Sequence, residues 1–330
     1  MKRFFLALLA LPTMVFAEDT LNSGDTAWMM VSTAFVLLMT PAGLALFYGG
    51  MTRSKNILNT YAMVFMAFVV AFVVWIAVGY SIAFGTAESA SVQTVIGGFS
   101  NVFLSGISWT DLSGTYPTYV FIVFQGTFAA ITVAIAAGSV IERIKFSTWI
   151  VFVAIWGIVV YAPITHMVWG GDGALLFDAG ALDFAGGTVV HMNGGLAGLV
   201  LAVLVGKRVG YPKTAMKPAS VILTAVGAAL LWFGWYGFNG GSAFGANAIA
   251  GLAYLTTTLA TAVAAVTWIL IEWIIFKKPT LLGAASGVVA GLVAITPAAG
   301  FVDVGGAMII GGVGSIIAFF GVATLKKKLG

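Results

Sequence analysis

Residues 184–206 read FAGGTVVHMNGGLAGLVLAVLVG, an apolar stretch that contains no Asp, Glu, Lys or Arg. Asp183 precedes this stretch, and Lys207-Arg208 follows it. A helix needs about 20 mainly apolar residues to cross the ~30 Å hydrocarbon core of a bilayer, so the stretch predicts a transmembrane helix. Its one titratable residue, His191, lies roughly 10 Å inward from Phe184, because a helix rises ~1.5 Å per residue.

The whole chain has the same apolar character. Of its 330 residues, 61% are hydrophobic and 8% are charged, whereas a soluble domain carries about 25% charged residues. The 13% aromatic content and the long apolar runs distinguish the chain from a disordered one. Since the sequence has no cysteine, a disulfide or zinc–thiolate framework is excluded. The composition predicts an all-α polytopic membrane protein.

The first 17 residues form a separate segment. A basic pair, Lys2-Arg3, precedes the apolar run 4–16, and a small-x-small cleavage site ends at Ala17. This pattern is typical of a secretory signal peptide, and the apolar run is too short to span a bilayer as a helix. We expect residues 1–17 to be cleaved and residues 18–330 to form a single membrane domain. A retained N-terminal anchor helix is the alternative.

Nine apolar segments after the leader are long enough to cross the membrane. We place them near 26–48, 60–85, 118–141, 146–169, 184–206, 219–238, 247–274, 281–296 and 301–323. Small residues recur at four-residue intervals within them, as in Gly194 and Gly198, and in Gly283, Gly287 and Gly291. Such spacing lets helix backbones approach closely in lipid, so we expect one compact helical bundle.

Basic residues mark alternate loops between these segments. With Lys2 and Arg3 they account for all 15 basic residues: Arg53 and Lys55; Arg143 and Lys145; Lys207, Arg208, Lys213 and Lys217; Lys277 and Lys278; and Lys326, Lys327 and Lys328. The opposite loops carry only acidic charges. The positive-inside rule then predicts an outside N-terminus and a cytoplasmic C-terminus. It also explains the net positive charge without a nucleic-acid partner.

His191 is the strongest functional candidate among the polar residues of the spans. The residues on its helical face are mostly small: Phe184, Gly187, Thr188, Gly194, Gly195 and Gly198. That setting predicts an imidazole facing protein or a cavity rather than lipid. Intramembrane ionisable groups often mark ion or proton pathways, although a hydrogen-bonded core histidine is the alternative.

Other candidates lie where spans meet the outer loops. Asp183 precedes a helix, where a carboxylate accepts the unpaired amide hydrogens of the first turn; a role in cation recruitment is compatible with this capping. Trp169 suits either an interfacial aromatic belt or a site. The Gly-broken aromatic stretch 235–242 suits either a cavity lining or a helix end. Glu142 and Glu272 are predicted to be solvated charges at the cytoplasmic interface.

Several motifs resemble one known family, the ammonium transporter (Amt/Mep/Rh) family. The signature-like segment is Asp183–Gly195, DFAGGTVVHMNGG. Further matches follow the family's order: Phe47–Met51 with Lys55-Asn56, Glu142–Phe146, Gly234–Ser242, and Lys278–Gly283 leading into Thr296–Ala298. The match extends over nearly the whole mature chain, and it resembles bacterial Amt proteins more than Rh proteins.

The resemblance implies a homotrimer in the bacterial inner membrane, in which each subunit has a narrow pore for ammonium or methylammonium and no cofactor. By motif match, Phe128, Trp169 and Ser242 would form the outer ammonium site, and Phe128 with Phe238 would form a gate. A cation over aromatic faces gains about 0.5–2 kcal/mol. His191 would be the first of two pore histidines. Histidine titrates near neutrality and suits a proton relay that spares ammonium the cost of crossing apolar space as a charge.

The chain also departs from the family pattern. Family members have eleven spans built from an inverted repeat of five and five plus one, and this sequence holds nine. The resemblance places the second pore histidine in a Gly-Val-His-Gly-like motif of the tenth span, which this sequence does not contain. His166 does not match that motif, because it lies three residues before Trp169. The tail that binds PII-type signalling proteins in many relatives is likewise not seen. We therefore expect residues 18–330 to be truncated after the ninth span. The parent protein is expected to transport ammonium, and activity of the 330-residue chain alone stays open.

Other functions remain possible on the sequence alone. An Rh-like ammonia gas channel or an ammonium sensor would share the fold, whereas an ion-coupled transporter of unrelated fold would explain the broken helices and Asp183. A membrane enzyme is disfavoured, because two histidines 25 residues apart and no cysteine offer neither clustered metal ligands nor a nucleophile–base pair.

Overall fold

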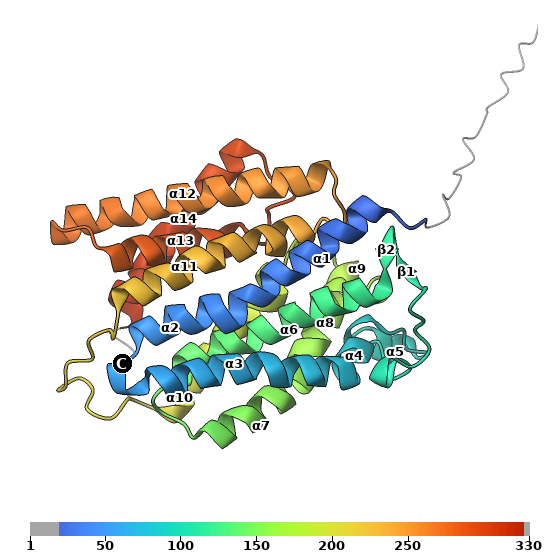
Figure 1. Cartoon of the computed structure of the whole chain (residues 1–330), viewed down its shortest axis with the longest axis horizontal. Helices are drawn as coiled ribbons and strands as arrows, with labels where there is room; N and C mark the ends of the chain where they lie inside the picture. The colour runs from blue at the N-terminus through green and yellow to red at the C-terminus, as the bar shows by residue number, and fades with distance from the viewer. Residues whose placement is uncertain (1–19, 327–330) are drawn as a thin grey trace, which may run out of the picture.

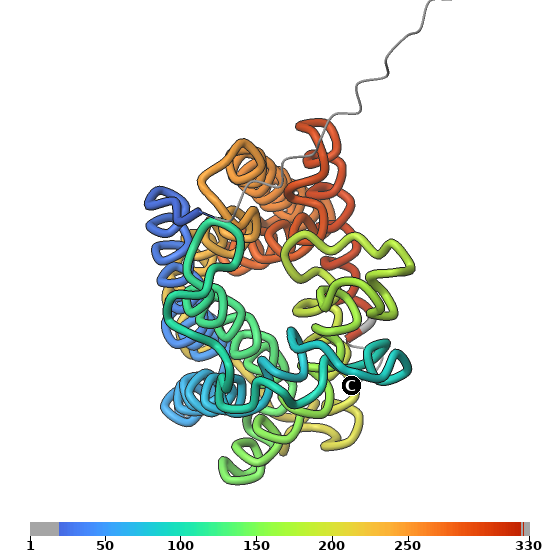
Figure 2. The backbone as a smooth tube through the Cα atoms, turned by 90° about the vertical axis from the view of Figure 1, so that its right-hand side faces the viewer, coloured from blue at the N-terminus to red at the C-terminus, as the bar shows by residue number. Residues whose placement is uncertain are grey.

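The computed structural model describes residues 20–326 and is almost entirely helical (Figure 1). The expected signal peptide, residues 1–17, lies outside the described residues. The long helices run side by side along the long axis of the molecule, and viewed along this axis they form a ring (Figure 2). A short antiparallel hairpin, β1 (Leu112–Ser113) with β2 (Tyr116–Pro117), lies in the connection before the third span. The predicted all-α membrane fold is confirmed.

The α-helices have the following bounds. In chain order they are α1 (Ser23–Leu38), α2 (Ala45–Met51), α3 (Ile57–Val74), α4 (Tyr80–Phe84), α5 (Ala90–Gln93), α6 (Thr118–Val140), α7 (Phe146–Trp156), α8 (Ala162–Trp169), α9 (Leu175–Asp178), α10 (Asn193–Val205), α11 (Val221–Trp235), α12 (Ala248–Phe276), α13 (Leu281–Ile295) and α14 (Val304–Phe320).

Continuous helical stretches occupy all nine predicted segments within residues 20–326. Eight are long and apolar enough to cross a membrane: Ser23–Met51, Ser54–Phe84, Thr118–Val140, Phe146–Trp169, Gly187–Val205, Val221–Gly240, Ala248–Phe276 and Val304–Thr324. The ninth, α13, has 15 residues and is about 22 Å long. The exact number of crossings therefore stays a prediction, as does the orientation of the chain.

Many spans contain a π-helical turn, in which one extra residue widens the helix locally. Such turns are often found at functional sites. Among them are Gly187–Met192, which carries His191, and Tyr236–Gly240, which carries Phe238. Because a π-helical turn contains one extra residue, the helix continues through it, but the side chains after the turn are rotated about the helix axis relative to those before it.

The glycine spacing of α13 has the expected packing role. A Cβ at Gly291 would lie 2.7 Å from Thr261 Cα, and one at Gly287 would lie 2.9 Å from Ala265 Cα, both on α12. The backbones of α12 and α13 are therefore too close for any larger residue. Elsewhere on the bundle, large apolar side chains such as Val203 on α10 and Ile274 on α12 are about 70% exposed, as expected for a lipid-facing surface.

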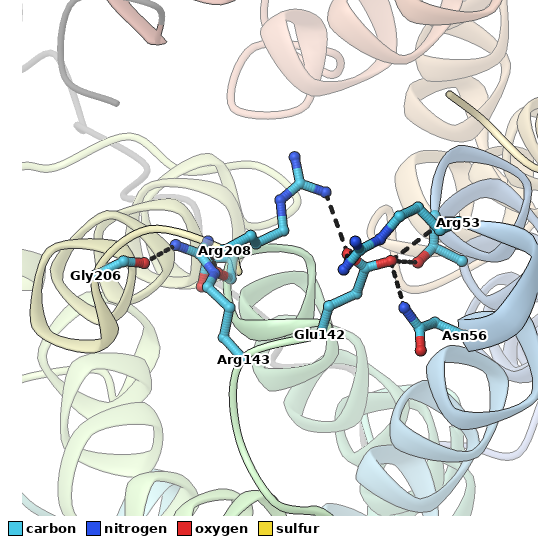
Figure 3. Close-up of polar contacts among 8 residues, drawn as sticks. Arg53, Asn56, Glu142, Arg143, Gly206 and Arg208 are labelled. Atoms are coloured by element: carbon cyan, nitrogen blue, oxygen red, sulfur yellow. Dashed lines mark hydrogen bonds and ion pairs between the residues drawn. The ribbon is translucent and has the colours of Figure 1, made fainter. Parts of the chain in front are cut away.

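The prediction that Glu142 and Glu272 are solvated is wrong. The Glu142 side chain is only 1% exposed and forms an ion pair with Arg53 at 2.6 Å (Figure 3). It also accepts hydrogen bonds from Thr52 Oγ1, from the backbone and Nε of Arg53, and from Asn56 Nδ2. Burial alone would raise the pKa of this carboxyl, but the hydrogen bonds outweigh it and lower the pKa to about 2.

Glu272 is buried for a related reason. Its carboxylate accepts the backbone N–H of Thr280 at 2.7 Å and the hydroxyl of the same residue. Both glutamates thus fix a loop to a helix end. The sequence places a basic residue near each of them but does not reveal that the loop folds back to supply hydrogen-bond donors.

Candidate functional site

A pocket of about 370 Å³ opens at the end of the bundle where α6 begins and α8 ends. Trp169, Ser242 and Asp183 line it, together with Gln125 and several phenylalanines. These residues are far apart in sequence. They meet because α6, the end of α8, the segment before α10 and the segment after the Tyr236–Gly240 turn converge at this end of the molecule.

Trp169 is held firmly at the wall of this outer pocket. Its indole N–H donates to the backbone carbonyl of Asp183 at 2.9 Å. Its ring lies edge-on to Phe128, with the centroids 6.2 Å apart and an interplanar angle of 73°. The hydrogen bond ties the last residue of α8 to the segment that precedes α10, so the ring orientation is set by two parts of the chain.

Phe128 and Phe238 do not line the outer pocket but lie behind Trp169, which Phe128 contacts. Their rings stack with centroids 4.2 Å apart and an interplanar angle of 23°, and their exposed fractions are 1% and 0%. Phe124 packs 4.8 Å from Phe128 on the same helix. Because Phe238 also stacks on His191, the pair lies between the rings of Trp169 and His191.

His191 lies directly beyond the stacked pair. Its imidazole stacks on Phe238 at 5.7 Å and on Trp235 at 5.3 Å. Both ring nitrogens are buried and have no hydrogen-bond partner within residues 20–326. Leaving a buried polar group unpaired usually costs about 1–3 kcal/mol, which makes this histidine unusual for a structural residue.

A second, narrower pocket of about 180 Å³ continues below His191. Apart from the imidazole and Tyr48 its walls are apolar, with Leu44, Phe47 and Val293 among them. The rings of Trp169, Phe128, Phe238 and His191 therefore contact one another in this order between the two pockets, and we call them the column of rings.

Ser242 and Gln125 supply polar atoms to the outer pocket. The Ser242 hydroxyl donates to Phe238 O at 2.8 Å, so the oxygen lone pairs can accept a hydrogen bond from a ligand. The side-chain carbonyl of Gln125 is buried without a partner among the described residues. Gln125 lies three residues before Phe128 on α6, and only the structure shows that it lines the outer pocket.

Asp183 has the geometry of a helix cap. Its Oδ1 accepts the amides of Gly186 and Gly187 at 2.9 and 2.6 Å, and its Oδ2 accepts those of Thr188 and Val189 at 2.8 and 3.0 Å. Four donors surround one carboxylate. Its part in recruiting a cation stays a prediction.

His166 lies apart from the column of rings. It is fully buried, and its two ring nitrogens contact the backbone carbonyls of Ala83 and Gln93 at 2.9 and 2.7 Å. It lines neither the outer nor the inner pocket. The structure thus brings Phe128, Phe238, Trp169 and Ser242 together above His191.

Comparisons with known proteins agree on one family. The sequence profile of the Ammonium Transporter Family matches residues 27–330. An ammonium transporter from Aquifex aeolicus (strain VF5) is 51% identical over 315 residues, which cover 95% of this chain and 72% of that protein. One from Bacillus subtilis (strain 168) is 47% identical, over 94% of this chain and 75% of that protein. The crystal structure of Candida albicans Mep2 matches with a TM-score of 0.85 and 38% identity, covering 94% of this chain and 68% of that one.

Proposed function

This chain belongs to the ammonium transporter family, and we propose that ammonium follows the column of rings from Trp169 to His191. The family is one of transporters rather than enzymes, and the chain is a multi-pass membrane protein. The observation that carries the proposal is the order of an outer pocket, a stacked phenylalanine pair and a histidine whose nitrogens have no partner among residues 20–326.

Recognition takes place in the outer pocket. Trp169 presents its π-system to a cation in the pocket, an interaction that contributes about 0.5–2 kcal/mol depending on desolvation. Phe128, which the family resemblance also assigns to this site, contacts Trp169 from behind the pocket wall. The lone pairs of Ser242 Oγ and of Gln125 Oε1 accept N–H groups of the bound ammonium. Potassium has the same charge but no hydrogen to donate, so these acceptors favour ammonium.

Passage requires the ion to lose its charge. Phe128 and Phe238 stack too closely for a hydrated cation, and an ion in apolar surroundings carries a large desolvation penalty. When the two rings move apart, ammonium reaches the ring of His191, releases one proton to it and becomes ammonia. The proton is taken up by a nitrogen of His191, whose two nitrogens have no other partner within residues 20–326. The inner pocket then accepts the uncharged ammonia.

The assembly and placement belong to the same proposal. We infer a homotrimer in the bacterial inner membrane, with residues 1–17 removed, the N-terminus outside and the C-terminus in the cytoplasm. The support is the family resemblance and the segregation of basic residues to alternate loops. A PII-type protein is the regulator that the resemblance implies for the parent protein.

Uptake of radiolabelled methylammonium into proteoliposomes tests the proposal. We expect ammonium to compete and potassium at the same concentration to leave uptake unchanged. Competition by potassium or sodium would refute selective binding at Trp169 and Ser242. Uptake that rises with pH in proportion to uncharged methylamine would favour a gas channel, and specific binding without uptake would favour a sensor.

A further inference from the structure

A third cavity, of about 320 Å³, lies at the opposite end of α6 from the outer pocket. The side chains of Arg143, Arg208 and Lys326 line it, along with Tyr48, Thr52 and Ser139. Figure 3 shows Arg53 and Arg208 on either side of Glu142, with Arg143 on the same side as Arg208. Nothing in the proposed transport route requires a basic cavity here.

Among the residues that the structure describes, no Asp or Glu lines this basic cavity. The nearest carboxylate, Glu142, is already paired with Arg53 at 2.6 Å and lies 3.7 Å from Arg208. Burial lowers the pKa of the Arg143 guanidinium, and the charge of Arg208 lowers it further. Burial, Arg208 and Arg143 together lower the pKa of Lys326. The three cations therefore repel one another in a partly desolvated space.

The hydroxyl groups of the cavity have no hydrogen left to donate. Tyr48 donates to Ile135 O, Thr52 to Glu142, and Ser139 to Ala136 O. The remaining donors belong to the cationic side chains.

Arg143 is one of these cationic side chains. Its terminal nitrogens bond the carbonyls of Gly206 and Ser139, and its Nε is buried without a partner among the described residues. A ligand that fits must carry negative charge and several acceptor oxygens. A phosphate group has both, and arginine binds it well because the guanidinium offers several fixed N–H donors.

We propose that the cavity lined by Arg143, Arg208 and Lys326 binds a phosphate group. The group comes either from free inorganic phosphate or from the headgroup of an anionic phospholipid, since basic pockets between membrane helices on the cytoplasmic side bind such headgroups. Tyr48 lines both this cavity and the pocket below His191. The bound phosphate group thus lies next to the inner end of the column of rings. Binding itself does not depend on the transport proposal.

The test measures binding to purified protein with two probes. Inorganic phosphate is titrated by calorimetry, and phosphatidylglycerol is compared with phosphatidylcholine by native mass spectrometry. The double variant Arg208→Gln/Lys326→Gln should weaken binding by about 30-fold, given the contribution of each basic residue near an anionic headgroup. The control Lys55→Gln/Lys213→Gln removes the same charge from exposed positions that do not line the cavity, and it should change binding by less than about twofold.

The outcomes separate the sources and the alternatives. Phosphate binding that phosphatidylglycerol displaces supports the cavity with either source. Selective phosphatidylglycerol binding without phosphate binding identifies the lipid headgroup. If both double variants lose the same binding affinity, the anion is attracted by the overall surface charge rather than by the cavity, and the proposal is overturned. The proposal is also overturned if neither probe binds the wild-type protein. If the double variant unfolds at a lower temperature, Lys326→Gln alone is measured against Lys55→Gln, with the same criteria.

Discussion

Trp169 shows how a single side chain depends on distant parts of the chain. Its indole hydrogen bond to Asp183 O and its edge-on contact with Phe128 set the ring in place. We predict that Trp169→Leu raises the KM for methylammonium by about 2- to 30-fold, which corresponds to the loss of one cation–π contact. Uptake kinetics provide the measurement.

The matched control is Trp109→Leu. Trp109 lies in the loop 85–117 and is 76% exposed, so its replacement should leave the KM unchanged. Equal effects of the two variants would mean that Trp169 acts only as one of many interfacial tryptophans.

Asp183 allows capping and cation recruitment to be separated. Loss of a helix cap costs about 0.5–2 kcal/mol, and this carboxylate accepts four amides. We predict that Asp183→Ala lowers the free energy of unfolding by about 2 kcal/mol or more, and that Asp183→Asn, which keeps one acceptor oxygen, has about half that effect. Thermal unfolding in detergent measures both. An Asn variant of wild-type stability with a raised KM would instead favour recruitment.

Several site residues were predictable because their chemistry is unusual for their position. A histidine inside an apolar span and an aspartate directly before it stand out in sequence, whereas the pairing of Phe128 with Phe238 came from motif resemblance. The side-chain carbonyl of Gln125, which has no partner in the part of the chain that the structure describes, was not predictable, because its surroundings depend on which residues of other helices approach it. Glu142 was misjudged for the same reason: its donors come from a loop almost 90 residues earlier.

At the scale of elements, Glu142 holds the loop between α2 and α3 against the end of α6. Its pKa is lowered from 4.5 to about 2. A carboxyl with a depressed pKa in the folded state contributes stability above its unfolded pKa, and this contribution is lost as the pH falls through the folded pKa. We predict that wild type is more stable than Glu142→Gln by a constant margin down to about pH 4.5, and that the margin shrinks between there and about pH 2.

Thermal unfolding midpoints recorded from neutral pH downward check this prediction. Glu88→Gln, at an exposed outer position, is the control and should show no comparable margin at neutral pH. A margin that is already gone near pH 6 would contradict the ion-paired geometry of Arg53 and Glu142.

The positions of the helices were predictable to within a few residues because apolar length and flanking charge define a span physically. The π-helical turns were not, since they arise from packing between helices rather than from a local pattern. The short α13 illustrates the remaining difficulty. Its 15 residues follow directly after a Pro-containing loop, and hydropathy alone does not decide whether such a helix crosses the bilayer.

At the scale of the whole molecule, the separation of charges predicts the orientation in the membrane. Because the chain has no cysteine, single cysteines report accessibility without background. We predict that a membrane-impermeant thiol reagent labels Thr110→Cys from outside the cell and labels Lys213→Cys only after the membrane is opened. Both positions are exposed. The reverse pattern would invert the orientation and place the Trp169 pocket in the cytoplasm.

The central proposal for the column of rings that ends at His191 is that ammonium enters as a cation and that the histidine takes up its proton. The most direct test is the current that follows a jump in ammonium concentration across proteoliposomes containing the full-length protein. We predict a transient current for ammonium, none for an equal jump in potassium, and loss of the ammonium current in His191→Ala. A potassium current of similar size, or an ammonium current unchanged in His191→Ala, would contradict the account.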